Sequence, residues 1–170
     1  MSRSSHALLI LTAALATSAC SKKTPEDLPP PPTTSPAQTR TEERAPSIIP
    51  GSQADFVRQM AGKDIIYFDT DRFNIDDIDA TALQTQAQWL ARYPNKRATI
   101  EGHADERGTR EYNLALGERR SNAARNYLVS LGVDASRLTA VSYGKERPVA
   151  LGANESAWAQ NRRAVTITID

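Results

Sequence analysis

Hydrophobic and polar positions along most of the chain follow two periods, one typical of strands and the other of helices. Alternating and β-forming residues predict strands at 64–68, 97–103, 138–143 and 164–169. Spacings of three and four predict helices at 54–60, from Asp76 or Asp77 to Pro94, from Arg110 to Leu131, and at 155–160. This order predicts one α/β domain over 53–170, an α+β sandwich in which a βαβαβ-type mixed sheet of about four strands packs on two main helices.

The long helix at 110–131 carries the most informative pattern. Its expected buried stripe repeats at alternating spacings of three and four and comprises Leu114, Gly117, Ser121, Ala124, Leu128 and Leu131. Asn113 and Arg120 lie at the margin of this stripe, roughly 20° from each other, whereas Arg119 points away from it. One arginine is therefore expected where the helix leaves the core.

Asp105 precedes this helix in a turn bounded by Gly102 and Gly108. A fixed carboxylate opposite the fixed guanidinium of Arg120 is typical of a receptor for a group that carries both charges. The same two side chains can also form a salt bridge with each other at the edge of the domain. The residues alone leave both interpretations open.

The N-terminal segment is typical of a secretory signal, because Arg3 precedes an apolar run over 7–16 that is too short to span a bilayer. Cys20, the only cysteine, follows small residues as in a bacterial lipobox, although Thr17 stands where leucine is usual. We expect a lipoprotein signal peptide over 1–19 and a lipid anchor on Cys20. The alternative is an ordinary cleaved signal with a cysteine that is not modified.

Residues 20–52 contain most of the ten prolines, among polar residues and few large apolar ones. Such a segment cannot bury enough surface to fold, so we expect a disordered, Pro-rich tether between Cys20 and the domain. Twenty of the 21 basic residues and all 20 acidic residues follow Cys20, so the side-chain charges there balance. The balance argues against nucleic acid as a partner, because phosphate binding needs a basic surplus.

An enzyme is a third interpretation, since Glu101, His103 and Asp105 have spacings that place them on one face of a strand. Such a set can mimic a metal site or an acid–base pair. However, His103 is the only histidine after Cys20, and neither a nucleophile elbow nor a phosphate-binding loop is present. We therefore expect no catalytic activity, no metal and no cofactor.

Several long motifs recur in a fixed order, namely Tyr67–Asp69, Glu101–Thr109, Tyr112–Asn113, Leu116–Arg120, Val141–Lys145 and Asn161–Val165. They resemble the family of peptidoglycan-associated lipoproteins, whose C-terminal domain is OmpA-like. The resemblance extends over about residues 56–170, and the order and spacing of the motifs make it specific. The signal, the cysteine and the tether match the layout of the same family.

This resemblance implies an outer-membrane lipoprotein whose domain faces the periplasm and binds peptidoglycan non-covalently at meso-diaminopimelate. The implied ligand site comprises Asp71, Asp105, Asn113, Leu116 and Arg120. The resemblance also implies a place in the Tol–Pal system of envelope integrity and cell division, with Tol proteins such as TolB as partners. The alternative is mainly an interaction hub for Tol partners that binds the wall weakly.

The chemistry of diaminopimelate suits these residues, because it presents an ammonium and a carboxylate on one carbon atom. Arg120 can hold the carboxylate by two parallel hydrogen bonds, which a lysine cannot copy. Asp105, supported by Asp71, can accept hydrogen bonds from the ammonium.

Overall fold

The computed structural model describes residues 48–169. The expected signal peptide, the lipid anchor on Cys20 and most of the expected tether lie outside the described residues. The elements follow one another as α1 (Gln53–Met60), β1 (Ile65–Tyr67), α2 (Asp77–Arg92), β2 (Arg97–His103), α3 (Arg110–Ser130), η1 (Ala135–Arg137), β3 (Leu138–Gly144), α4 (Glu155–Asn161) and β4 (Arg163–Ile169). Among residues 48–169, no helix has both the length and the apolar character needed to cross a membrane.

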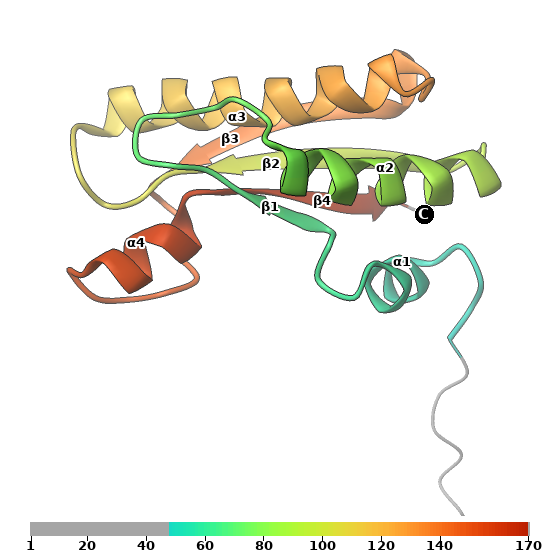
Figure 1. Cartoon of the computed structure of the whole chain (residues 1–170), viewed down its shortest axis with the longest axis horizontal. Helices are drawn as coiled ribbons and strands as arrows, with labels where there is room; N and C mark the ends of the chain where they lie inside the picture. The colour runs from blue at the N-terminus through green and yellow to red at the C-terminus, as the bar shows by residue number, and fades with distance from the viewer. Residues whose placement is uncertain (1–47, 170) are drawn as a thin grey trace, which may run out of the picture. The chain divides into compact units, whose positions relative to one another are not determined.

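The four strands form one mixed sheet in the order β1-β4-β2-β3. Strand β4 pairs antiparallel with both β1 and β2, and β2 pairs parallel with β3. The two long helices α2 and α3 contact each other and run side by side along the sheet, with α1 and α4 at opposite ends (Figure 1). The mixed sheet on two main helices confirms the fold predicted from the sequence.

Both long helices start where the sequence predicts, and each start has a polar cap. The Asp76 carboxylate accepts a hydrogen bond from the Asp79 backbone N–H at 2.8 Å and caps α2. Thr109 caps α3 in the same way, since its hydroxyl oxygen accepts from the Tyr112 N–H at 3.2 Å. Helix α2 ends at Arg92, two residues before Pro94, because a proline disfavours helical backbone in the residue before it.

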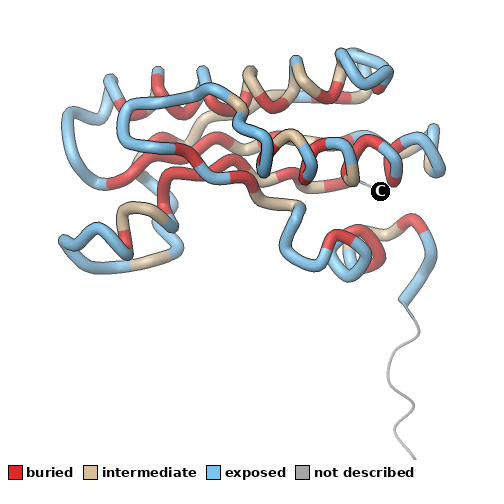
Figure 2. Tube along the Cα trace, viewed as in Figure 1, coloured by how far each residue is buried: buried red, intermediate tan, exposed pale blue. Residues whose placement is uncertain are grey.

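The core lies between the helices and the sheet, where buried positions concentrate in Figure 2. Helix α3 approaches β2 closely at a pair of glycines. A Cβ atom on Gly102 would lie 1.8 Å from the Gly117 carbonyl oxygen, and one on Gly117 would lie 2.4 Å from Ser142 Oγ. Only glycine fits at this contact, which sets the distance between the strand that leads to Asp105 and the helix that carries Arg120.

The helical phase predicted for α3 is confirmed at its charged positions, because Arg120 is buried and Arg119 is exposed. The expected stripe is also buried from Gly117 to Leu128. The prediction is wrong for Leu131, which is 38% exposed, and Leu114 is only partly buried. The helix ends at Ser130, and Gly132 adopts a φ of +94°, so the chain turns away before Leu131 reaches the core.

Candidate functional site

All five residues of the predicted site line one pocket of about 260 Å³. The pocket lies where the loop after β1, the loop after β2 and the first turns of α3 meet. Its lining comprises Thr70, Asp71, Asp105, Arg107, Gly108, Tyr112, Asn113, Leu116 and Arg120. The structure therefore brings the predicted residues together, while their role in ligand binding remains a prediction.

The loop between β2 and α3 is held in place by local bonds. Gly108 has a φ of +86°, a conformation that favours glycine, and it leads directly into the cap residue Thr109. The Asn113 side-chain amide donates hydrogen bonds to the Arg107 carbonyl at 2.7 Å and to the Thr109 carbonyl at 3.1 Å. Asn113 thus braces the loop that carries Asp105, and its own burial fixes the entry of the chain into α3.

The Asp105 carboxylate is paired with two arginines. Its Oδ1 atom accepts from the Arg107 backbone N–H at 3.1 Å and from Arg107 Nε at 3.0 Å. Its Oδ2 atom accepts from Arg107 Nη2 at 2.6 Å and from Arg162 Nη1 at 3.4 Å. Burial disfavours the charged form, but the hydrogen bonds and charge of Arg107, with help from Arg162, hold the pKa of Asp105 below its usual value.

Arg120 is satisfied differently, because its guanidinium donates only to backbone carbonyls. Nε donates to Arg72 O at 2.9 Å, Nη1 to His103 O at 2.8 Å, and Nη2 to Asp69 O at 3.0 Å. The residue is fully buried, and this burial, together with the charge of Arg162, lowers the pKa of Arg120 to about 10. Arg120 therefore fastens the loop after β1 to the end of β2 while it remains a cation without a carboxylate partner among the described residues.

The salt bridge between Asp105 and Arg120, left open by the sequence, is absent from the described part of the chain. Asp105 pairs with Arg107 and Arg162 instead. A guanidinium has five N–H donors, and the carbonyls engage three of those of Arg120. Two N–H donors of the buried Arg120 guanidinium therefore have no acceptor among the described residues. Arg120 lines a pocket that also contains the carboxylates of Asp71 and Asp105.

Asp71 supplies the second carboxylate of the pocket from an exposed loop. It adopts a positive φ of 56°, which is uncommon for a residue other than glycine, although Asp is among the more tolerant types. Its Oδ1 atom accepts from the Tyr112 hydroxyl at 3.0 Å. The hydrogen bond to Asp71 and the burial of the hydroxyl raise the pKa of Tyr112, so the phenol stays a donor. The other Asp71 carboxylate oxygen has no hydrogen-bond partner among residues 48–169.

Three side chains that shape the site were not predicted from the residues alone, namely Arg107, Trp158 and Arg162. Arg107 lines the pocket, and its guanidinium lies 4.2 Å from the ring centroid of Trp158 on α4. Arg162 comes directly after α4, and its Nε donates a hydrogen bond to the Phe68 carbonyl at 2.9 Å. Both arginines belong to motifs that carry the family resemblance, which is the only signal that singles them out in the sequence.

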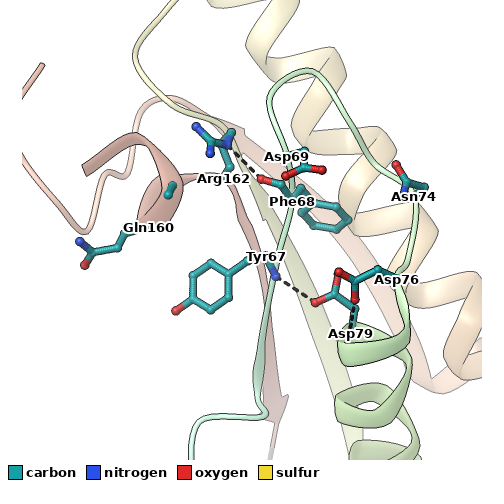
Figure 3. Close-up of a pocket in the computed structure, with 9 residues that line it drawn as sticks. Tyr67, Phe68, Asp69, Asn74, Asp76, Asp79, Gln160 and Arg162 are labelled. Atoms are coloured by element: carbon teal, nitrogen blue, oxygen red, sulfur yellow. Dashed lines mark hydrogen bonds between the residues drawn. The ribbon is translucent and has the colours of Figure 1, made fainter. Parts of the chain in front are cut away.

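A larger pocket of about 440 Å³ is lined by residues of the β1 end, the loop after it, the start of α2 and the α4 end, including Phe68, Asp69, Asp79 and Arg162 (Figure 3). Asp79 lines it and is 6% exposed; its Oδ1 accepts from the Tyr67 N–H at 3.2 Å, while its Oδ2 has no partner. Burial, together with the nearby charge of Asp76, raises the pKa of Asp79 to about 6. This pocket therefore differs from the first, because its buried carboxylate, Asp79, forms no ion pair with a described residue, although Arg162 also lines the pocket.

The acid–base interpretation of Glu101, His103 and Asp105 has no geometric support. His103 Nε2 lies 3.7 Å from a Glu101 carboxylate oxygen, and neither ring nitrogen has a hydrogen-bond partner in the described structure. Burial and the charges of Arg163 and Arg147 lower the pKa of His103 to about 4, so the ring is neutral. Within residues 48–169, no group of three or more His, Cys, Asp or Glu side chains is placed to hold a metal ion.

Comparison with known sequences identifies relatives over most of the chain. The model of the OmpA family matches residues 67–162. The peptidoglycan-associated lipoprotein of Rhizobium meliloti is 51% identical over 159 residues, which cover 94% of this chain and 84% of that protein. The protein with the same name from Agrobacterium fabrum is 58% identical over 123 residues, which cover 72% of this chain and 68% of that protein.

Solved structures give the same result. The crystal structure of the peptidoglycan-associated lipoprotein from Burkholderia pseudomallei superposes with a TM-score of 0.60 at 48% identity, and covers 62% of this chain and 89% of that one. The C-terminal domain of Helicobacter pylori MotB shares the fold alone, with a TM-score of 0.59, 18% identity, and coverage of 62% of this chain and 84% of that one. The OmpA family and the peptidoglycan-associated lipoproteins are non-enzymatic structural proteins, and the sequence analysis also predicts no catalytic activity for this chain. The chain therefore belongs to the OmpA family and is a homologue of the peptidoglycan-associated lipoproteins.

Proposed function

We propose that the protein is a lipoprotein of the outer membrane, anchored through Cys20, whose domain binds peptidoglycan non-covalently from the periplasm. The ligand is the meso-diaminopimelate residue of the stem peptide, and the pocket of Asp71, Asp105, Asn113, Leu116 and Arg120 is its site. Binding ties the outer membrane to the cell wall. The names and the identities of the relatives support the proposal at the level of the whole protein.

The observation that carries the proposal is the unmatched cation at Arg120. Its three carbonyl partners fix the guanidinium but do not neutralise it, and burial weakens the screening of its charge by water. A carboxylate is the group that best complements two remaining N–H donors of a guanidinium. The pocket therefore favours a ligand with a carboxylate.

The carboxylates of Asp71 and Asp105 favour a ligand that also carries a positive charge. Asp71 and Asp105 line the same pocket as Arg120, and the pocket contains Arg107 as a second cation, so its formal charges balance. A zwitterion complements both kinds of charge at once, because its carboxylate suits Arg120 and its ammonium suits the aspartates, whereas an acid or an amine alone complements only one of them. The free end of diaminopimelate is such a zwitterion.

A pocket of this size buries one amino-acid centre and little else, so we expect modest affinity for each domain. A lipid-anchored protein that faces an extended polymer gains strength from many simultaneous contacts. Strong attachment of the membrane to the wall therefore does not require a tight individual site.

Co-sedimentation of the purified protein with peptidoglycan sacculi tests the proposal. The unmodified domain should sediment with sacculi that contain meso-diaminopimelate and remain in solution with sacculi that contain lysine at that position. Asp71→Asn is a clean variant, because Asp71 is exposed and, among residues 48–169, its side chain bonds to Tyr112 alone. It should weaken sedimentation, while Asp77→Asn, an exposed change outside the pocket, should not. Equal sedimentation with both wall types would contradict the proposal.

Participation in the Tol–Pal system, with a partner such as TolB, is part of the same proposal and rests on the resemblance to the peptidoglycan-associated lipoproteins, a name that the homologues carry. Adding purified TolB to the sedimentation experiment tests it. We expect TolB to reduce the bound fraction, on the ground that both partners use the face of the pocket. Simultaneous binding of TolB and sacculi would contradict a shared face.

A further inference from the structure

The acceptor capacity of Asp105 is filled by the protein itself. A carboxylate offers about four lone-pair positions. Arg107 occupies three of them through its backbone N–H, Nε and Nη2, and Arg162 occupies the fourth through Nη1. A ligand ammonium can bind Asp105 only if one of these donors leaves.

The two arginines differ in how firmly they are held. The Arg162 side chain is 7% exposed, and it also bonds to the Phe68 carbonyl and the Glu155 carboxylate. The Arg107 side chain is 39% exposed, and beyond Asp105 the described residues offer it one hydrogen bond, to the Thr70 hydroxyl at 3.2 Å, and the face of Trp158. Arg107 is therefore the donor that can rotate into water with little loss of packing.

We propose that Arg107 is a built-in substitute for the cation of the ligand and determines specificity at Asp105. This inference rests on the proposed function of the pocket. The guanidinium neutralises Asp105 while the pocket holds no ligand, and the arriving ammonium displaces it in an exchange of one cation for another. Both states keep Asp105 paired, so neither leaves a buried charge unmatched.

Specificity follows from this exchange. A molecule with a carboxylate but no ammonium can approach Arg120, but it has no group to offer Asp105, so Arg107 stays in place and narrows the pocket. A molecule with both groups replaces Arg107 and gains the space that its side chain leaves. The pocket thus selects zwitterions and discriminates against simple acids.

Isothermal titration of a soluble disaccharide tripeptide that ends in meso-diaminopimelate tests the inference. The Arg107→Ala variant should bind about threefold to tenfold more tightly than the unmodified protein, because the Arg107 guanidinium no longer competes with the ligand ammonium for Asp105. Arg110→Ala is the matched control, since it removes an exposed arginine that pairs with Glu146 and does not line the pocket. It should leave the affinity unchanged. A thermal melt of each variant checks folding.

Weaker binding by Arg107→Ala would overturn the inference, because it would show that Arg107 contacts the ligand directly. If Arg107→Ala does not fold, Arg107→Lys serves instead; it keeps the charge without the planar fork and should bind more tightly than the unmodified protein by a smaller factor. The NMR signal of Arg107 Nε–H gives an independent readout in the unmodified protein, and a signal that ligand does not shift would also overturn the inference. Absence of any binding by the unmodified protein would refute the proposed function instead.

Discussion

The two ends of the pocket hold opposite charges that are satisfied in opposite ways. Asp105 is matched by charge, because two arginines surround its carboxylate and lower its pKa. Arg120 is matched by geometry, because three carbonyls hold its guanidinium and none carries a full charge. The anionic end is therefore paired within the protein, whereas the cationic end has no carboxylate partner among the described residues, and we propose that the ligand supplies that anion.

The largest effect is expected from removing Arg120, the buried cation at one end of the pocket. Arg120→Ala removes a fully buried side chain together with its hydrogen bonds to three backbone carbonyls, so it should lower the free energy of unfolding by about 3 kcal/mol or more. Urea denaturation measures the change. Arg119→Ala is the matched control, since this arginine is exposed and only faces the Phe73 ring at 5.8 Å; it should cost less than about 1 kcal/mol. Equal losses in the two variants would contradict the structural role of Arg120.

The next effect comes from the contact that sets the spacing between the two ends. Gly102→Ala would place a Cβ atom 1.8 Å from the Gly117 carbonyl oxygen, so β2 and α3 must separate. We expect a loss of about 2–3 kcal/mol in the free energy of unfolding, and weaker sedimentation with sacculi. Gly62→Ala meets no atom within 4 Å but has a φ of +92°, so backbone strain alone should cost about 1 kcal/mol. A smaller loss for Gly102→Ala than for Gly62→Ala would refute the close approach.

At the anionic end, Asp105→Asn should abolish the detectable sedimentation with sacculi and lower the free energy of unfolding by about 1–2 kcal/mol at pH 7. Because the pKa of Asp105 is lowered in the folded state, its stabilisation is present above the unfolded pKa of about 4 and is lost as the pH falls through the folded pKa. The stability difference between the two proteins should therefore shrink as the pH falls below 4. Glu111→Gln, an exposed change at the same end of α3, is the control. A difference that does not depend on pH would contradict the ion pairs at Asp105.

The smallest effect concerns Asp79 in the larger pocket, whose carboxylate forms no ion pair with a described residue. Asp79 has a raised pKa of about 6, so the folded state gains stability as the pH falls through 6 toward 4. His103 has a lowered pKa of about 4, so the folded state loses stability as the pH falls from 6.5 to 4. The two contributions oppose each other in the unmodified protein. Asp79→Asn should therefore lose stability more steeply than the unmodified protein between pH 7 and 4, as urea midpoints would show, and an unchanged slope would contradict the burial of an unpaired Asp79.

The comparison also explains how far the sequence alone could predict the molecule. The elements were predictable because local signals mark them, such as the cap at Asp76 and the turn at Gly132. The inward phase of Arg120 was predictable from helical periodicity. The pairing of Asp105 with Arg162 was not, because the two residues are 57 positions apart and no local pattern connects them.

The partners of Arg120 were also beyond the reach of sequence reasoning. Backbone carbonyls accept hydrogen bonds whatever the side chain, so Asp69 and Arg72 carry no signal for this role. Arg107 was expected only as part of a motif, since whether an arginine in a loop folds back on Asp105 depends on the stacking surface that Trp158 supplies from α4. Long-range packing decided these features.

The most direct test of the central claim is a calorimetric comparison of two soluble muropeptides that differ only at the third residue of the stem. One ends in meso-diaminopimelate and the other in lysine. Lysine keeps the side-chain ammonium but lacks the carboxylate that diaminopimelate carries on the same carbon atom. Our account predicts binding of the first and at least about tenfold weaker binding of the second, because only the first supplies the anion that Arg120 lacks. Equal affinity for the two peptides would contradict the account.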